Sequence, residues 1–269
     1  MQESLRETQG EMDFVKCCFS SESLCSENVY TEDLQLFYAE TSSVISRKKE
    51  LTRLLSPDEK LRALRFLSED DRETYIASHS LLRLLISGFI DKSPADLGFL
   101  KNSYGKPFLN CNPVFFNLSH TKGAFAFVIT KTSCVGVDLE EINRDFDINS
   151  IAGMVFSQKE KDYIFKTAEG SKDRFFRLWT RKEAFLKALG SGIVKELPEI
   201  EVCEKINLID PKHFEDDIVR SAKNEHFIYS AKIDRYFLSI AVTHKVNTRI
   251  MQLEADNIDF FLKRAHEIS

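Results

Sequence analysis

The chain has 269 residues, of which 43% are hydrophobic, and its formal net charge at pH 7 is -5. That length and apolar content are enough for one large core or two smaller ones. The acidic balance argues against a broad surface for nucleic acid or for an anionic membrane, because such partners require an excess of lysine and arginine. Any phosphate that the protein binds must therefore be met by a few local residues.

The cysteines and the start of the chain indicate a cellular location. The six cysteines form neither a CxxC pair nor zinc-finger spacing, so we interpret them as reduced, mostly buried thiols. The opening stretch, MQESLRETQGEMDF, lacks the basic and apolar regions of a signal peptide, and no later stretch approaches the roughly 18 apolar residues of a membrane span. We expect a cytoplasmic protein with no membrane attachment.

Strands and helices are predicted to alternate along the chain. Ser56 fits the cap of a helix that has Pro57 at its first position, and a later helical pattern stops near Gly88. The predicted helices cover 43–67, 71–90, 156–168 and 172–192. The predicted strands cover 13–20, 33–40, 113–120, 123–130, 133–140, 200–206, 226–233 and 236–244.

This order suggests an internal duplication. SPDEKLRALRF (56–66) and the helix after it resemble SQKEKDYIF (157–165) and the helix after that, and each helix pair is followed by strands. Two similar α+β halves packed face to face would leave a cleft, which is a favoured place for a small-ligand site. Chance similarity between two amphipathic helix pairs is the alternative.

Two acidic residues stand out on the predicted strand SCVGVDLEE. Because strand side chains alternate, Asp138 and Glu140 project from the same face, roughly 6.5 to 7 Å apart. Gly136, on that face too, indicates a close approach by ligand or backbone. If Glu183 on the long helix faces this strand, three carboxylates meet, as magnesium prefers. A solvated strand face with two ordinary acids is the alternative.

The helical stretch WTRKEAFLKAL (179–189) carries charges within an apolar pattern. Lys182 falls inside the apolar stripe, whereas Glu183 and Lys187 stack one turn apart on its flank. Either this helix lines a charged site, or Glu183 and Lys187 form an ordinary exposed pair.

Two further motifs carry polar groups that suit phosphate binding. In FFNLSH, Ser119 and His120 are neighbours in an extended chain, so they point apart and do not form a nucleophile and base. Phosphate binding suits both better, and a capped loop histidine is the alternative. In YGKPFL, Gly105 and Pro107 would fix Lys106 on a tight turn, where it could contact phosphate or ribose or remain solvated.

The ordered set YGKP, FNLSH, GVDLE and WTRKEAFLKALGSGI resembles the 4′-phosphopantetheinyl transferases of the surfactin-synthetase-activating type, over about residues 56 to 244. The resemblance implies an α+β pseudodimer of two similar α/β-sandwich halves, 1–132 and 133–269, with the active site in the cleft between them. It implies transfer of the phosphopantetheine arm of coenzyme A to a serine of an acyl or peptidyl carrier protein, which leaves adenosine 3′,5′-bisphosphate.

The resemblance also assigns roles to residues. Asp138, Glu140 and Glu183 would hold magnesium, and Lys187 would contact the pyrophosphate of coenzyme A. Glu183 is the expected base for the serine hydroxyl, directly or through a metal-bound water, with a metal-bound hydroxide as the alternative. The other residues expected to bind coenzyme A are Arg62, Thr74, Lys106, Pro107, Ser119 and His120.

Carrier binding is expected beside the predicted metal strand. Ile151, Met154 and Val155 would form an exposed apolar dock, unless this segment is an ordinary helix packed on the core. A basic rim would attract an acidic carrier, and its candidates are Lys159, Lys161, Arg174 and Arg181. Fatty-acid, polyketide and nonribosomal-peptide carriers are all open, with secondary metabolism favoured. We expect a monomer, because duplicated halves already supply the cleft.

Two rival functions are distinguishable from the transferase. A metal-dependent nuclease would also use acids on a strand with a nearby lysine, but the acidic balance weighs against it. A catalytically silent protein of the same fold, binding coenzyme A or a carrier, would bind without transfer. The presence of all three expected metal ligands argues against that second reading.

Overall fold

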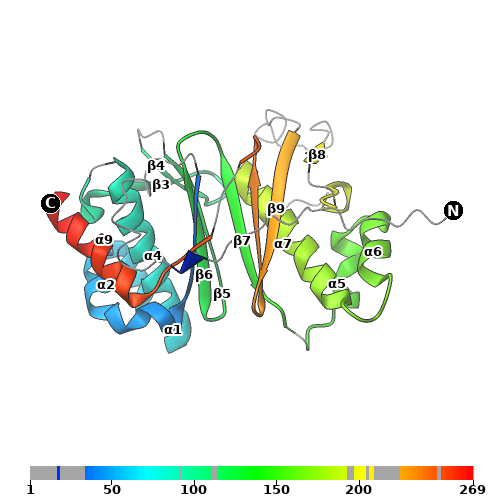
Figure 1. Cartoon of the computed structure of the whole chain (residues 1–269), viewed down its shortest axis with the longest axis horizontal. Helices are drawn as coiled ribbons and strands as arrows, with labels where there is room; N and C mark the ends of the chain where they lie inside the picture. Colours follow the sequence, from blue (N-terminus) through cyan, green and yellow to red (C-terminus); the bar gives the residue numbers. More distant parts are fainter. Residues whose placement is uncertain are drawn as a thin grey trace.

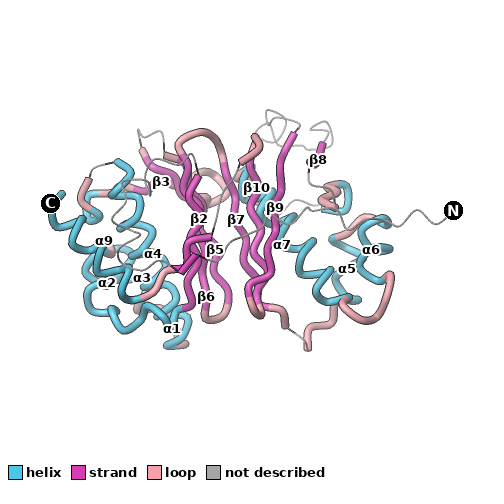
Figure 2. The backbone as a smooth tube through the Cα atoms, viewed as in Figure 1, coloured by secondary structure: helices cyan, strands magenta, loops and turns pink. Residues whose placement is uncertain are grey.

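The computed structural model describes residues 17–18, 34–90, 92–110, 114–143, 145–192, 197–203, 206–208, 225–246 and 250–268. Its elements stack in four layers, with helices on the two outer sides and two β-sheets facing each other in the middle (Figure 1). Coloured by secondary structure, the strands form a central block that is flanked by helices (Figure 2). The predicted α+β fold with two similar halves is confirmed.

The first half joins an antiparallel run of strands to an outer helical layer. Its helical segments are α1 (Thr41–Val44), η3 (Ile45–Arg47), α2 (Lys48–Leu54), α3 (Pro57–Ala63), α4 (Glu69–Ile90) and η4 (Pro94–Asp96). Its strands are β2 (Leu34–Glu40), β3 (Phe99–Lys101), β4 (Pro107–Leu109), β5 (Phe115–Thr121) and β6 (Ala124–Thr130). In the sheet, β6 pairs with both β2 and β5, while β3 and β4 form a separate hairpin. Helix α4 ends at Ile90, the last residue of the helix predicted over 71–90.

The second half repeats this plan. Its helical segments are α5 (Asn149–Val155), α6 (Gln158–Phe165), α7 (Ser171–Leu189) and η5 (Leu197–Glu199). Its strands are β7 (Val135–Glu141), β8 (Ile206–Leu208), β9 (Glu225–Ile233) and β10 (Tyr236–Val242), which form an antiparallel sheet in the order β7-β10-β9-β8.

The strand predicted at 200–206 is wrong for 200–203, which pair with no strand. Side chains satisfy the backbone there instead. Lys182 donates to the carbonyl of Ile200, Arg181 donates to the carbonyl of Val202, and a Glu160 oxygen accepts from the Val202 amide at 2.9 Å. Backbone groups that are already hydrogen-bonded to side chains are not available to pair with a neighbouring strand.

The end of the chain returns to the first half. Strand β11 (Ile250–Gln252) pairs in parallel with β2 and with β1 (Cys17–Cys18). Strand β1 lies within the strand predicted at 13–20, whose other residues fall outside the described ranges. Helix α9 (Ala255–Ile268) packs on α4, and Ile258 and Phe261 enter the first half's core (Figure 1). The C-terminal end of the predicted second half, 133–269, thus lies against the first half, and the division of the chain into these halves stays a prediction. Neither β11 nor α9 was predicted.

A third core lies between the two sheets and holds the halves together. Val135, Val137 and Leu139 of β7 point into it, as their alternation predicted. The opposite face of β7 lies against α7. A Cβ atom built on Gly136 would lie 1.9 Å from the carbonyl oxygen of Ala184, so only glycine permits this approach. The close approach predicted at Gly136 is confirmed, and the neighbour is the backbone of α7.

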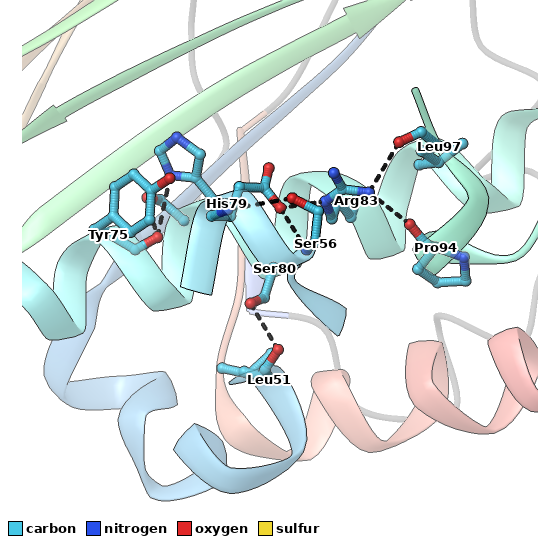
Figure 3. A network of polar contacts seen from close by, with 10 residues as sticks. Leu51, Ser56, Tyr75, His79, Ser80, Arg83, Pro94 and Leu97 are labelled. Carbon is cyan, nitrogen blue, oxygen red and sulfur yellow. Dashed lines mark hydrogen bonds and ion pairs between the residues drawn. The ribbon is translucent and has the colours of Figure 1, made fainter. Parts of the chain in front are cut away.

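A buried ion pair organises each helical layer, and the first half shows it clearly. Ser56 and Glu59 form a capping box at the start of α3, as predicted for Ser56. Glu59 also accepts from Arg83 Nε of α4 at 2.7 Å. The Arg83 guanidinium donates in addition to the carbonyls of Pro94 and Leu97, at 2.8 and 3.0 Å (Figure 3). One cation thus ties α3, α4 and η4 together.

The second half contains the same device about a hundred residues later. Ser157 and Glu160 form the capping box of α6, and Glu160 pairs with Lys182 Nζ of α7 at 2.8 Å. Lys182 donates in addition to the carbonyls of Leu197, at 2.8 Å, and Ile200. The repeated arrangement supports duplication over chance similarity. It also explains why Lys182 lies within the apolar stripe, since its side chain is only 1% exposed.

Two smaller expectations also meet the structure. Of the cysteines in the described part of the chain with placed side chains, Cys134 is exposed and Cys203 is half-buried, so the prediction of mostly buried thiols is wrong for them. Cys25 and Cys111 lie outside the described residues. Within the described ranges, no helix combines the length and the apolar character needed to cross a bilayer.

Substitution of Lys182 by methionine should destabilise the protein by about 3–5 kcal/mol, because it leaves the Glu160 carboxylate buried without its cation. Urea unfolding followed by circular dichroism measures the change. The matched control is Lys159→Met, which removes a lysine that is 57% exposed and should cost about 0–1 kcal/mol. Equal losses in the two variants would contradict a structural role for the buried pair.

Candidate active site

Strand β7 and helix α7 bring four of the predicted site residues to one place. The Asp138 side chain is 4% exposed, and its Oδ1 accepts from Lys187 Nζ at 2.6 Å and from Ser119 Oγ at 3.0 Å. Glu140 lies two residues along the same face of β7, and Glu183 lies one turn before Lys187 on α7. Three acids and one lysine therefore share the junction of strand and helix.

Trp179 fixes the second acid and was not predicted to do so. Its Nε1 donates to Glu140 Oε1 at 3.2 Å, and its ring stacks on Phe175 with centroids 6.3 Å apart. Sequence reasoning placed Trp179 in the apolar stripe and overlooked its one polar atom. Since a buried indole N–H needs an acceptor, the single tryptophan of the chain one turn before Glu183 was the available signal.

Burial and the charge of Asp138 raise the pKa values of Glu140 and Glu183. Burial, followed by the negative charge of Asp138, raises the pKa of Glu140 to about 7. Burial and the charge of Asp138 also raise the pKa of Glu183, while the nearby ammonium of Lys187 opposes that change. Crowded carboxylates in a partly dry site favour binding of a cation or of protons.

The donors suit a hard cation in chemistry, although they are not gathered into a finished ligand set. Asp138 Oδ2 is buried and has no hydrogen-bond partner among the described residues. Magnesium prefers carboxylate oxygens, and a buried carboxylate oxygen with no hydrogen-bond partner fits the chemistry of such a ligand. As the side chains stand in the part of the chain described, no three acidic, histidine or cysteine groups converge closely enough to hold a metal. The magnesium site stays a prediction.

Strand β5 meets the edge of β7 through side chains in place of a backbone ladder. Asn117 Oδ1 accepts from the Val137 amide at 2.9 Å, and the hydroxyl oxygens of Ser119 and Thr121 accept from the next alternate amides of β7 at 3.3 Å. The spacing N-x-S-x-T supplies one acceptor for every second residue of β7. This arrangement joins the two sheets, a role that sequence reasoning missed for Asn117 and Thr121.

The hydroxyl of Ser119 is fully engaged. It donates to Asp138, and it accepts from the Leu139 amide at 3.3 Å and from Lys187 Nζ at 2.8 Å. A serine hydroxyl offers one donor and two acceptor positions, and all are used. Its expected phosphate contact stays a prediction. In this arrangement the Ser119 hydroxyl instead connects Asp138 to Lys187 by hydrogen bonds.

The remaining residues expected at the nucleotide end lie in the first half. His120 lies near the end of β5, where partial desolvation and the positive charges of Lys187 and Arg62 lower its pKa. Arg62 lies over the ring of Tyr75, 5.6 Å from its centroid. Thr74 is buried, with its hydroxyl 2.9 Å from that of Thr41. The structure therefore places Arg62 near His120 but turns Thr74 into the core, and both contacts with coenzyme A stay predictions.

A pocket of about 270 Å³ opens beside Glu183 and Lys187, between the two halves. The first half contributes the turn that contains Lys106 and Pro107, and the second half contributes the last turns of α7 with Glu183 and Lys187. The residues that line it are Tyr104, Gly105, Lys106, Pro107, Asn117, Glu183, Leu186, Lys187, Gly190 and Gly192. A ligand there would touch the predicted base and the predicted phosphate-binding lysine at once.

The segment expected to receive the carrier is a helix that is half packed on the core. Met154 is 67% exposed, Ile151 is half-buried and Val155 is buried. Two of the four rim candidates are structural. Arg181 is buried and donates to the carbonyls of Val202 and Ile228, while Arg174 donates to three carbonyls around the start of α7.

Comparison with known proteins gives the class. The 4′-phosphopantetheinyl transferase superfamily profile matches residues 134–240, and the profile of the 4′-phosphopantetheinyl transferase N-terminal region matches residues 45–133. The junction of the two profiles falls beside the start of β7. The chain therefore belongs to the 4′-phosphopantetheinyl transferase family.

Individual relatives agree with this class. The 4′-phosphopantetheinyl transferase HetI of Nostoc sp. is 35% identical over 162 residues, which are 58% of this chain and 68% of the relative. The transferase Sfp of Bacillus subtilis is 29% identical over 55% of this chain and 66% of its own length. The transferase gsp of Aneurinibacillus migulanus is 30% identical over 52% of this chain and 57% of its own.

Replacement of Glu140 by glutamine should stabilise the metal-free protein at high pH. The folded-state pKa of Glu140 lies above its ordinary value of 4.5, so stability is lost as pH rises from about 4.5 to about 7, where the unfolded chain releases a proton that the folded protein keeps. In EDTA, Glu140→Gln should match the wild type at about pH 4 and exceed it at about pH 8 by on the order of 2–3 kcal/mol. Denaturant unfolding at both pH values measures this. The same difference at both would contradict the crowding of charge.

Proposed function

We propose that this chain transfers the phosphopantetheine arm of coenzyme A to a serine of a carrier protein, at the pocket between its halves. The observation that carries the proposal is that Glu183 and Lys187 line this pocket. Both also interact with Asp138 at the junction of β7 and α7, where Glu140 lies two residues along the strand. Family membership supplies the reaction class. In that reaction the serine oxygen bonds to the phosphorus next to the pantetheine arm, and the bond from this phosphorus to adenosine 3′,5′-bisphosphate breaks.

Charge neutralisation comes from two sources. Magnesium held by Asp138, Glu140 and Glu183 would supply positive charge to the pyrophosphate of coenzyme A. Lys187 is the chain's own cation at the pocket, and its ammonium already lies between Asp138 and Ser119. With those anchors its remaining donor capacity faces the pocket, where it binds the phosphate oxygens on which charge develops.

The serine proton needs a base, and Glu183 is our assignment. It lines the pocket, and burial with the negative charge of Asp138 raises its pKa, so its carboxylate takes up a proton more readily than an exposed one. The proton leaves the serine oxygen as that oxygen attacks phosphorus. Lys187, four residues along α7, opposes the rise and keeps the carboxylate available in its ionised form.

The setting of the reaction follows from the same features. Because both halves of one chain line the pocket, a monomer is sufficient for activity. Met154 is our candidate contact for the carrier on α5, and Lys159 and Lys161 remain as its basic rim. We infer a cytoplasmic enzyme that serves secondary metabolism, in keeping with the sequence resemblance.

Intact-mass spectrometry of an apo carrier protein, incubated with the protein, coenzyme A and magnesium, tests the proposal. The carrier should gain one phosphopantetheine arm. The Glu183→Gln variant should be slower by about 10²-fold or more, the usual contribution of a general base. The exposed acid Glu169, changed to glutamine, is the matched control and should leave the rate unchanged.

Three results would count against the proposal in different ways. Coenzyme A binding without transfer to any of several carriers would indicate a silent binding protein. Failure to bind coenzyme A would overturn the assignment of the pocket. Full activity of Glu183→Gln would overturn the assignment of Glu183 as the base, although the transferase activity itself would stand.

A further inference from the structure

The ammonium of Lys106 does not face open solvent or the pocket centre. Its Nζ donates to the carbonyl oxygens of Lys187, at 2.5 Å, Val135, at 3.1 Å, and Ala188, at 3.2 Å. A lysine ammonium has three donors, and these three carbonyls use all of them. No donor is left for a phosphate or ribose while this arrangement holds.

Those carbonyls belong to the two elements that carry the site. Val135 begins β7, three residues before Asp138. Lys187 and Ala188 lie at the end of α7, one turn after Glu183. Lys106 itself comes from the first half, directly before β4, so a single side chain connects three parts of the pocket wall.

Asn102 makes a second connection from the same turn. Its Nδ2 donates to the carbonyl of Gly190 at 2.9 Å, and its Oδ1 accepts from the amides of Tyr104 and Lys106 at 3.0 and 2.9 Å. Gly190 ends α7 in the left-handed conformation, with φ of 76°. A Cβ there would lie 3.1 Å from Asn102 Nδ2 and 3.2 Å from Lys106 Cδ, which shows how closely the turn fits the helix end.

The chemistry of this contact is that of a helix cap. The last carbonyls of a helix lack intrahelical partners and carry the negative end of its dipole, so a cation there is favourable. Burial disfavours the charged form of Lys106 and lowers its pKa to about 8. The hydrogen bonds to the three carbonyls offset this cost of desolvation. The first half thus supplies the C-terminal cap for the helix of the second half.

We propose that Lys106 and Asn102 are positioning residues, which lock the end of α7 to the start of β7 and so hold Glu183 and Lys187 in register with Asp138 and Glu140. This inference rests on the proposed transferase site but departs from the expectation that the Lys106 ammonium binds the ligand. The pocket wall, in this view, is assembled across the halves by the turn 102–106.

Steady-state kinetics with coenzyme A separate a positioning role from ligand binding. Lys106→Met and Asn102→Ala should each lower kcat by about tenfold to a hundredfold, as misplacement of catalytic groups does, and change KM for coenzyme A less than about threefold. Lys106→Arg, which still donates to the carbonyls, should recover part of kcat. Lys101→Met, an exposed lysine of the same hairpin, is the matched control and should change neither constant. A raised KM with unchanged kcat in Lys106→Met would overturn the proposal.

Hydrogen exchange tests the same contact without reference to activity. Amides at the end of α7, residues 186–190, should exchange faster in Lys106→Met and Asn102→Ala than in the wild type or Lys101→Met, while amides of α4 stay unchanged. Unaltered exchange at 186–190 would overturn the cap. If the wild type transfers nothing to any carrier, the proposed function fails, yet this exchange result still decides whether Lys106 caps the helix.

Discussion

The contact between Gly136 of β7 and the backbone of α7 is the constraint on which the site depends. A side chain at this position would collide with the helix, because its Cβ would lie 1.9 Å from the Ala184 carbonyl oxygen. The absence of that side chain lets the strand lie directly on the helix. Asp138 then comes within 2.6 Å of the Lys187 ammonium, and Glu183 lies close enough to feel the charge of Asp138. Acids of a strand and of a helix become one electrostatic unit.

The lysines near α7 show how similar residues divide the work. Lys182 is buried against Glu160 and two carbonyls, as Arg83 is buried against Glu59 in the first half. Lys106 caps the far end of the helix, and Lys187 lies at the pocket beside Asp138. Lys182 and Lys106 therefore stabilise the frame, and Lys187 is available to a ligand. Because removing a charge from water is costly, a cation is buried where carbonyl or carboxylate oxygens accept its hydrogen bonds.

Much of the fold could be predicted from the sequence because its signals are local. The alternation of Val135, Val137 and Leu139 predicted the faces of β7, and SPDEK predicted the helix cap at Ser56. The pairing of β11 with β2 could not be predicted, because the two strands are more than two hundred residues apart in the sequence. Strand β11 is also only three residues long, which is too short for a recognisable alternation. The sequence pointed to Asp138 and Lys187, which the structure brings together, but not to the hydrogen-bond partners of the site residues. Which carbonyls receive Lys106 and Lys182 depends on distant loops, and the engagement of Ser119 depends on the edge of a neighbouring strand.

The most direct test of this account is a crystal structure with coenzyme A and manganese in place of magnesium, located by its anomalous scattering. The account predicts one manganese peak in contact with Asp138, Glu140 and Glu183, beside the pyrophosphate, with the Lys187 ammonium on a phosphate oxygen and the Lys106 ammonium still on the end of α7. Coenzyme A bound in the pocket with manganese elsewhere, or with Lys187 remote from the phosphates, would contradict it.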